Sequence, residues 1–179
     1  MSEQREVVLV QLGECGEQSG PVGSICTEES FRLRRAHAEE SGSRWFVLSV
    51  HHGVLAPEEW VTPRAEVDGL VSGRHWRAWA DWVAAQLDQR LQDAGGLDGV
   101  RLTLLADPGW EVHLAPAADA WGAELDAPIA GATEEERDAW VSERLEDPPP
   151  ALPLGAGTDT MFAARPGQEA VVEALLALG

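Results

Sequence analysis

Short β-branched runs alternate with segments of helical periodicity along most of this chain, and this alternation is the strongest constraint on its fold. Strands are expected at residues 6–12, 44–50 and 100–105. Between and after them the sequence predicts helices, at about residues 30–42, 72–94, 116–123 and 133–145. Such alternation is typical of α/β domains. We therefore expect a three-layer α/β domain with a mostly parallel central sheet and flanking helices.

The helical segments carry start and stop signals as well as apolar faces. The longest one has an apolar stripe made of Trp76, Ala80, Val83, Leu87 and Leu91. A tryptophan row at this spacing is typical of a core rather than of a base-stacking surface. Gly42 is a plausible stop for the first helix, and Thr133 with Glu136 forms a capping-box pattern at the last.

The alternation stops near residue 145, where the sequence "EDPPPALP" begins. Helical periodicity returns only at residues 166–178. We therefore expect one α/β domain at residues 1–147. Residues 148–179 would be a Pro-rich linker and a short C-terminal helix that packs on the core or on a partner.

Charge and cysteine content narrow the functional classes. The formal net charge is −18, and the 13 basic residues are all arginines. A field of this sign repels polyphosphate, so simple nucleic-acid binding is disfavoured, and a solvated acidic surface is the plainer interpretation. Two cysteines are too few for a disulfide framework, and neither a leader nor a membrane span is evident. We expect a cytoplasmic chain without membrane contact; its oligomeric state is open.

The second strand runs directly into "SVHHG", which places Ser49, His51, His52 and Gly53 at a strand end. In open α/β sheets ligands bind beyond the carboxyl ends of the strands. His51 and His52 can contact a ligand or act as acid or base, and Gly53 permits a sharp turn. The alternative is an ordinary turn with two surface histidines. We favour the first interpretation, in which this stretch is the floor of the main pocket.

The densest basic cluster contains Arg34 and Arg35, which can bind phosphate or carboxylate. The alternative is pairing with glutamates of the same helix. Cys15 and Cys26 with the two histidines lack the spacing of a structural zinc site, so no metal is expected. A Cys15 thiolate nucleophile has no local signature either.

Several of these segments resemble a prokaryotic and phage domain-of-unknown-function family, numbered six-eight-eight-four. Its members typically combine an early cysteine, a Leu-Tyr-x-Ser-x-x-Phe helix start, and a Leu-Ser-Ala-Lys-Tyr/His-Gly-Leu-Leu-x-Pro strand end. Here Cys15, Phe31 with "RLRRAHAE", and "LSVHHGVLAPEEWVTP" correspond to them, and the later "WGAELDAPIAGATEEERDAW" resembles the family's final segment. The resemblance spans about residues 6–145.

The chain also departs from that pattern at positions that would build a site. His51 stands for the lysine, Glu28 for the serine, and Asp107 for the glycine usual after the third strand. Leu-Tyr is replaced by Ile25-Cys26, and Tyr-Asp after the proline by Arg64-Ala65. Related Leu-Ser-x-x-Tyr-Gly signatures occur in families tied to nucleic acid or modified bases, an analogy at the level of fold.

Two functions follow as expectations. In the first, the domain binds a nucleotide, modified base or nucleic-acid end at the strand-end loops, with hydrolase- or glycosidase-like chemistry. Its catalytic residues would be Ser49, His51 and His52, and its ligand-binding residues Cys15, Arg34, Arg35, Gly53 and Asp107. In the second, it is a non-catalytic acidic protein-interaction module descended from such an enzyme. No cofactor is expected in either case.

Overall fold

The computed structural model describes residues 5–62 and 72–146, and these form an α/β domain around one mixed sheet. The sheet has five strands in the order β4-β3-β1-β6-β7. Their bounds are β4 Gly53–Leu55, β3 Arg44–Ser49, β1 Arg5–Gln11, β6 Val100–Leu105 and β7 Glu124–Asp126. All neighbours are parallel except β3 and β4. The predicted three-layer fold is confirmed.

Strand β1 lies at the centre of the sheet and is buried on both of its faces. Val7 and Leu9 contact the core on one face, whereas Val8 and Val10 contact the core on the other. Successive side chains of a strand point to opposite faces, so an unbroken apolar run is what a strand covered on both sides requires. This is why "VVLV" reads as a central parallel strand.

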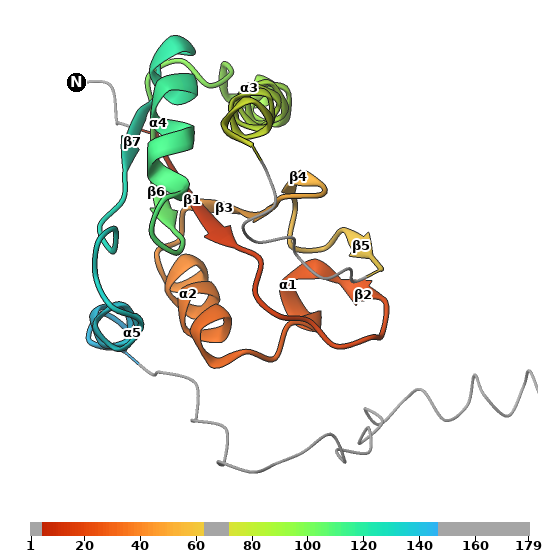
Figure 1. Ribbon diagram of the computed structural model, residues 1–179, viewed down its shortest axis with the longest axis vertical. Helices are drawn as coiled ribbons and strands as arrows, with labels where there is room; N and C mark the ends of the chain where they lie inside the picture. Colours follow the sequence, from red (N-terminus) through yellow and green to blue (C-terminus); the bar gives the residue numbers. More distant parts are fainter. Residues whose placement is uncertain (1–4, 63–71, 147–179) are drawn as a thin grey trace, which may run out of the picture. The chain divides into compact units, whose positions relative to one another are not determined.

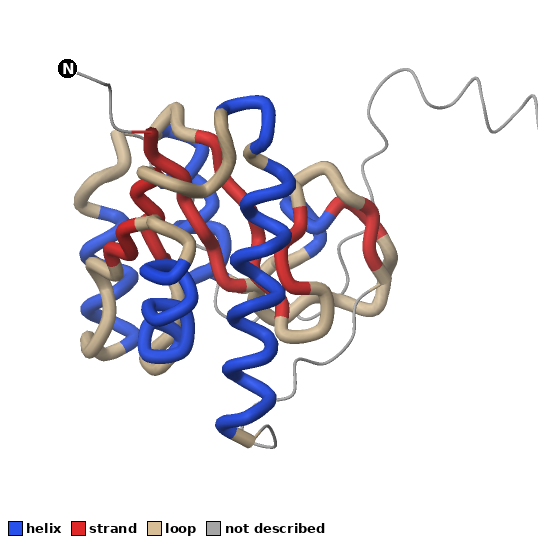
Figure 2. The backbone as a smooth tube through the Cα atoms, turned by 90° about the horizontal axis from the view of Figure 1, so that it is seen from above, coloured by secondary structure: helices blue, strands red, loops and turns tan. Residues whose placement is uncertain are grey.

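Four main helices cover the two faces (Figure 1). Helices α3 (Gly73–Arg90) and α4 (Trp110–Ala120) pack with each other over the core that contains Val7 and Leu9. Helix α2 (Glu29–Glu40) covers the other face and packs with α5 (Glu134–Ser142). Figure 2 shows the long helix α3 lying over the sheet. Trp79 of α3 is buried there and lies edge to face with the buried Trp110, at 5.2 Å between ring centroids. Trp76 is partly buried against the same core, whereas Trp82 is 43% exposed, so the core interpretation of the tryptophan row holds only in part.

The edge strand β4 is sealed by side chains of α3. The Val54 N–H donates to Gln86 Oε1 at 2.8 Å, and the Val54 carbonyl accepts from Arg90 Nη2 at 2.9 Å. An edge strand with free backbone groups would offer a template for pairing with another chain. Gln86 and Arg90 bond these backbone groups of Val54 within the molecule, so the groups are not free to pair with another strand.

The structure differs from the predicted secondary structure in two segments. The helix expected at residues 116–123 begins six residues earlier, at Trp110, and Pro116 lies inside it. The preference of proline for a first turn placed the start too late. Residues 13–25, a glycine-rich segment for which the sequence predicted no strand or helix, contain β2 (Gly20–Pro21) and the short helix α1 (Val22–Ile25). β2 pairs with β5 (Trp60–Val61) in a separate two-stranded ribbon.

Other predicted details are confirmed. Gly42 has a positive φ of 68° directly after α2, and Thr133 and Glu136 form the expected capping box. The longest predicted helix is α3 followed by a 3₁₀ turn at Gln92–Ala94. The linker and helix expected at residues 148–179 lie outside the described residues. Within the described residues, no helix combines the length and apolar character needed to cross a membrane.

Replacing Gly53 by alanine tests the tight turn between β3 and β4. Its φ is +69°, and a Cβ there would collide with Gln86 and lie 3.1 Å from Trp82. We expect a loss of about 2–4 kcal/mol in the free energy of unfolding, from left-handed strain plus overpacking.

Gly42→Ala is the matched control, because Gly42 also has a positive φ, +68°, but the Cβ of an alanine there would meet no atom within 4 Å. It should cost only about 1 kcal/mol of strain. Denaturant titration of both variants gives the comparison. Equal losses would mean that the contacts with Gln86 and Trp82 do not constrain the turn.

Candidate functional site

The carboxyl ends of β1 and β6 lie side by side at a point where the chain changes direction. The two strands are parallel neighbours, with Val10 opposite Leu105. The chain leaves β1 toward α2 on one face of the sheet, and leaves β6 toward α4 on the other face. In open α/β sheets the crevice between two such strands is the usual ligand site.

Asp107 follows β6 at this point and is tied to the end of β1. The Gln11 amide group donates from Nε2 to Asp107 Oδ2 at 3.1 Å, while Gln11 Oε1 accepts from the Asp107 backbone N–H at 2.6 Å. This pair of bonds fixes the backbone that follows β6. The Asp107 side chain is nevertheless 46% exposed.

Two buried arginines from different helices converge on one oxygen of that carboxylate. Arg34 Nη2 of α2 lies 2.9 Å from Asp107 Oδ1, and Arg137 Nη2 of α5 lies 3.1 Å from the same atom. The Arg34 side chain is only 4% exposed. Arg137 also donates to the Ala132 carbonyl at 2.7 Å. We call Gln11, Arg34, Asp107 and Arg137 the Asp107 cluster.

The Asp107 cluster carries more positive than negative charge. Two guanidinium groups face a single carboxylate, and within the described residues neither arginine Nε has a hydrogen-bond partner. A buried cation is costly unless it is paired. Among the groups in direct contact, positive charge therefore exceeds negative charge, in a chain of net charge −18 and with Asp138 nearby.

Asp138 lies close to these arginines and is electrostatically perturbed. Burial raises the pKa of its carboxyl group, and Glu134 and Glu29 raise it further, against the lowering effect of Arg34 and Arg137. Within the part of the chain that is described, its buried Oδ1 has no hydrogen-bond partner. The group therefore holds its proton to a higher pH than a free aspartate does.

The stretch "SVHHG" forms the hairpin turn between β3 and β4. Ser49 pairs with Gly53 across the hairpin. The Ser49 side chain is fully buried, and its Oγ accepts from the backbone N–H groups of His51 and His52, each at 3.2 Å. Trp79 Nε1 of α3 donates to the Ser49 carbonyl at 3.0 Å. Ser49 and Gly53 thus have turn-forming roles.

The two histidines differ in their surroundings. His51 is exposed, whereas His52 is half-buried and lines a surface hollow beside Trp60. The strand ends at Ser49, so the alternation of strand faces does not extend to His51 and His52. Their role as acid or base stays a prediction.

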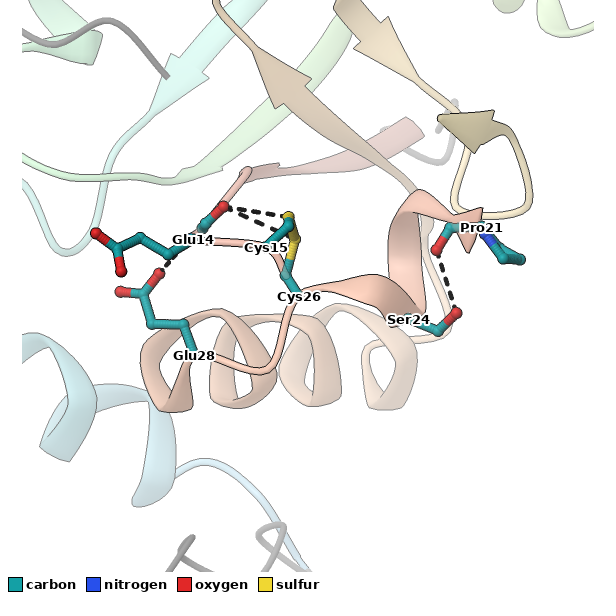
Figure 3. The surroundings of a disulfide bond; sticks show 7 residues. Glu14, Cys15, Pro21, Ser24, Cys26 and Glu28 are labelled. Atoms are coloured by element: carbon teal, nitrogen blue, oxygen red, sulfur yellow. Dashed lines mark hydrogen bonds between the residues drawn. A yellow bond between two sulfur atoms is a disulfide. The ribbon is translucent and has the colours of Figure 1, made fainter. Parts of the chain in front are cut away.

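The structure pairs the two cysteines with each other. Cys15 and Cys26 form a disulfide that joins the loop after β1 to the segment before α2 (Figure 3). Beside it, Glu28 accepts from the Glu14 backbone N–H at 2.8 Å and from Ser30 Oγ at 2.7 Å. In this disulfide Cys15 has no free thiol. The expected contact of Cys15 with a ligand stays a prediction. The residues described hold no cluster of three or more histidine, cysteine or acidic side chains suited to a metal.

The two arginines named from the sequence, Arg34 and Arg35, have different partners. Arg34 points into the Asp107 cluster, whereas Arg35 pairs with Glu39 of its own helix at 2.8 Å, the alternative considered from sequence. Gln11 and Arg137 were missed. Both carried a signal: Gln11 is polar at the end of a buried strand, and Arg137 shares helical spacing with the buried Val141.

The comparisons with known proteins give one match. A family model described as a family of unknown function, DUF6884, matches residues 16–143. No curated protein and no solved structure matches significantly.

Replacing Asp138 by asparagine should stabilise the fold, and the gain should grow as the pH rises above 3.8, the ordinary pKa of this carboxyl group. Because its folded pKa is raised, the neutral form contributes stability that is present at low pH and is lost as the pH rises through the folded pKa. Asparagine keeps a neutral group at every pH. Denaturant titrations of both proteins from pH 3.5 to 7 measure the difference. A less stable Asp138→Asn variant at neutral pH would mean that attraction to Arg34 and Arg137 dominates.

The disulfide should contribute to stability through the loop that it closes. Cys15 and Cys26 are 11 residues apart, and a loop of this size is worth about 2–3 kcal/mol when cross-linked. We expect a Cys15→Ser, Cys26→Ser double variant to lose that amount in denaturant titration. Reductant should destabilise the wild type to the same level and leave the variant unchanged. Two free thiols in the unreduced, denatured wild type would contradict the bond.

Proposed function

The chain belongs to the DUF6884 family of unknown function, and we propose that it binds the phosphate of a nucleotide at the carboxyl ends of β1 and β6. The anion is inferred from the structure. The nucleotide class is the expectation from the strand-end signature, whose relatives are tied to nucleic acid and modified bases.

One observation carries the proposal: Arg34 and Arg137 approach the same Asp107 oxygen at the carboxyl edge of the sheet. Guanidinium groups bind phosphate with charge-assisted hydrogen bonds, and a pair that shares one oxygen is already spaced for an oxyanion. In this proposal Asp107, with its half-exposed side chain, occupies the anion position in the free protein. The phosphate displaces its carboxylate and takes over both arginine contacts.

The proposal is one of binding. The Ser49 hydroxyl, expected as a catalytic group, is buried and accepts two backbone N–H groups. Cys15 is in a disulfide. Hydrolase- or glycosidase-like chemistry therefore stays a prediction that this proposal does not need.

Arg34→Gln should weaken nucleotide binding about 10- to 100-fold, because one charged hydrogen bond to phosphate is worth about 1.5–3 kcal/mol. Arg35→Gln is the matched control: Arg35 is the next residue of α2 and pairs with Glu39 outside the Asp107 cluster. Calorimetry with nucleoside monophosphates and triphosphates, inorganic phosphate and unphosphorylated nucleosides gives the affinities. Phosphorylated ligands should bind and Arg35→Gln should bind them like the wild type.

Asp107→Asn supplies a test that does not remove an arginine. Removing the competing carboxylate charge should tighten phosphate binding, and phosphate should raise the Tm of this variant more than that of the wild type. If neither protein binds any phosphorylated ligand, the proposal is wrong. The acidic interaction module, favoured by the net charge of −18, then becomes the leading function.

A further inference from the structure

A second candidate site lies beside the β3–β4 turn. It is a hollow of about 420 Å³ lined by His52, Leu55, Glu59, Trp60, Val61 and Thr62. This volume falls in the range of small-ligand sites. The hollow joins the end of the turn to the β2–β5 ribbon.

Trp60 is the most exposed large apolar side chain of the described residues, at 72%. Its backbone is nevertheless held on both sides. Pro21 pairs with Trp60 across the ribbon, and the Val22 N–H donates to the Glu59 carbonyl at 2.9 Å. Ser19 and Thr62 share a hydrogen bond between their hydroxyl groups at 3.0 Å. The fold fixes the backbone beneath an indole ring that it leaves in solvent.

The polar groups of the hollow limit what it can accept. Glu59 is held by Arg90 at 3.0 Å and by the Ala56 backbone N–H at 2.7 Å, so its charge is largely compensated. The half-buried His52 ring makes no hydrogen bond to any described residue, which leaves it a donor or acceptor for a ligand. The net charge of −18 opposes an anionic ligand.

We propose that this hollow binds an uncharged planar nitrogen heterocycle, of the purine or pyrimidine type, stacked on Trp60 and hydrogen-bonded at its edge by His52. An exposed aromatic face and a polar group beside it are the two elements by which proteins bind an unpaired base. The inference does not rest on the phosphate site, because it uses none of the residues of the Asp107 cluster.

The test uses the full chain with ¹⁵N-labelled indole groups, observed by NMR. The probes are adenosine, guanosine, cytidine and uridine, with methyl glucoside as a sugar that also stacks on tryptophan. We expect at least one nucleoside to shift the Trp60 indole signal, which is identified as the one missing from Trp60→Phe. Trp60→Ala should weaken this binding tenfold or more, and His52→Ala should weaken it to a smaller degree.

Trp121→Ala is the matched control, because Trp121 is also exposed, at 40%, but follows α4 at a different part of the domain. It should bind nucleosides like the wild type. Arg34→Gln should also leave the nucleoside shift of Trp60 unchanged, which separates this site from the phosphate site. Because Trp60 is exposed, Trp60→Ala should keep the wild-type Tm within a few degrees.

Three results would overturn the inference. They are a Trp60 signal that no nucleoside moves at millimolar concentration, a methyl glucoside affinity equal to that of the best nucleoside, and a Trp60 signal that moves with protein concentration alone. The last would identify the ring as a contact between copies of the chain. Once Trp60→Phe has identified the signal, titration of the wild type decides all three.

Discussion

Burial of β1 on both faces is the constraint on which the rest of the domain depends. A parallel strand between two parallel neighbours must be covered by helices on each side. Here α2 covers one side and α3 with α4 the other. The same requirement sends the chain from β1 and β6 to opposite faces of the sheet, and the Asp107 cluster lies at the strand ends where the two paths part. The candidate site is therefore a result of how the core is closed.

The Asp107 cluster joins segments that are far apart in the chain. Gln11 ends a strand, Arg34 lies in the first long helix, Asp107 follows β6 and Arg137 lies in the last described helix. One carboxylate thus links α2 and α5 to the sheet edge. Arrangements of buried charge are costly, and they persist where the surrounding packing holds them or where a ligand uses them.

The sequence predicted the fold class and the central elements because they depend on local periodicity. The strand at Val100–Leu105 was predicted to the residue, and the capping box at Thr133 was read directly. The strands β4, β5 and β7 were missed because two or three residues carry no periodicity, and they exist through pairing with distant strands. For the site, Arg34 and Asp107 were named from sequence, but their contact depends on long-range topology. Pairing of Cys15 with Cys26 was missed because no strand or helix was predicted for the β2–α1 segment that lies between them.

The sealed edge of β4 also makes one backbone group a reporter on tertiary structure. The Val54 N–H is bonded to the Gln86 side chain of α3 and not to a neighbouring strand. Its exchange with solvent deuterium is therefore governed by separation of α3 from β4, whereas exchange of the β1 amide groups requires the sheet itself to open. The rate at this one amide measures how often the long helix lifts from the sheet, independently of global unfolding.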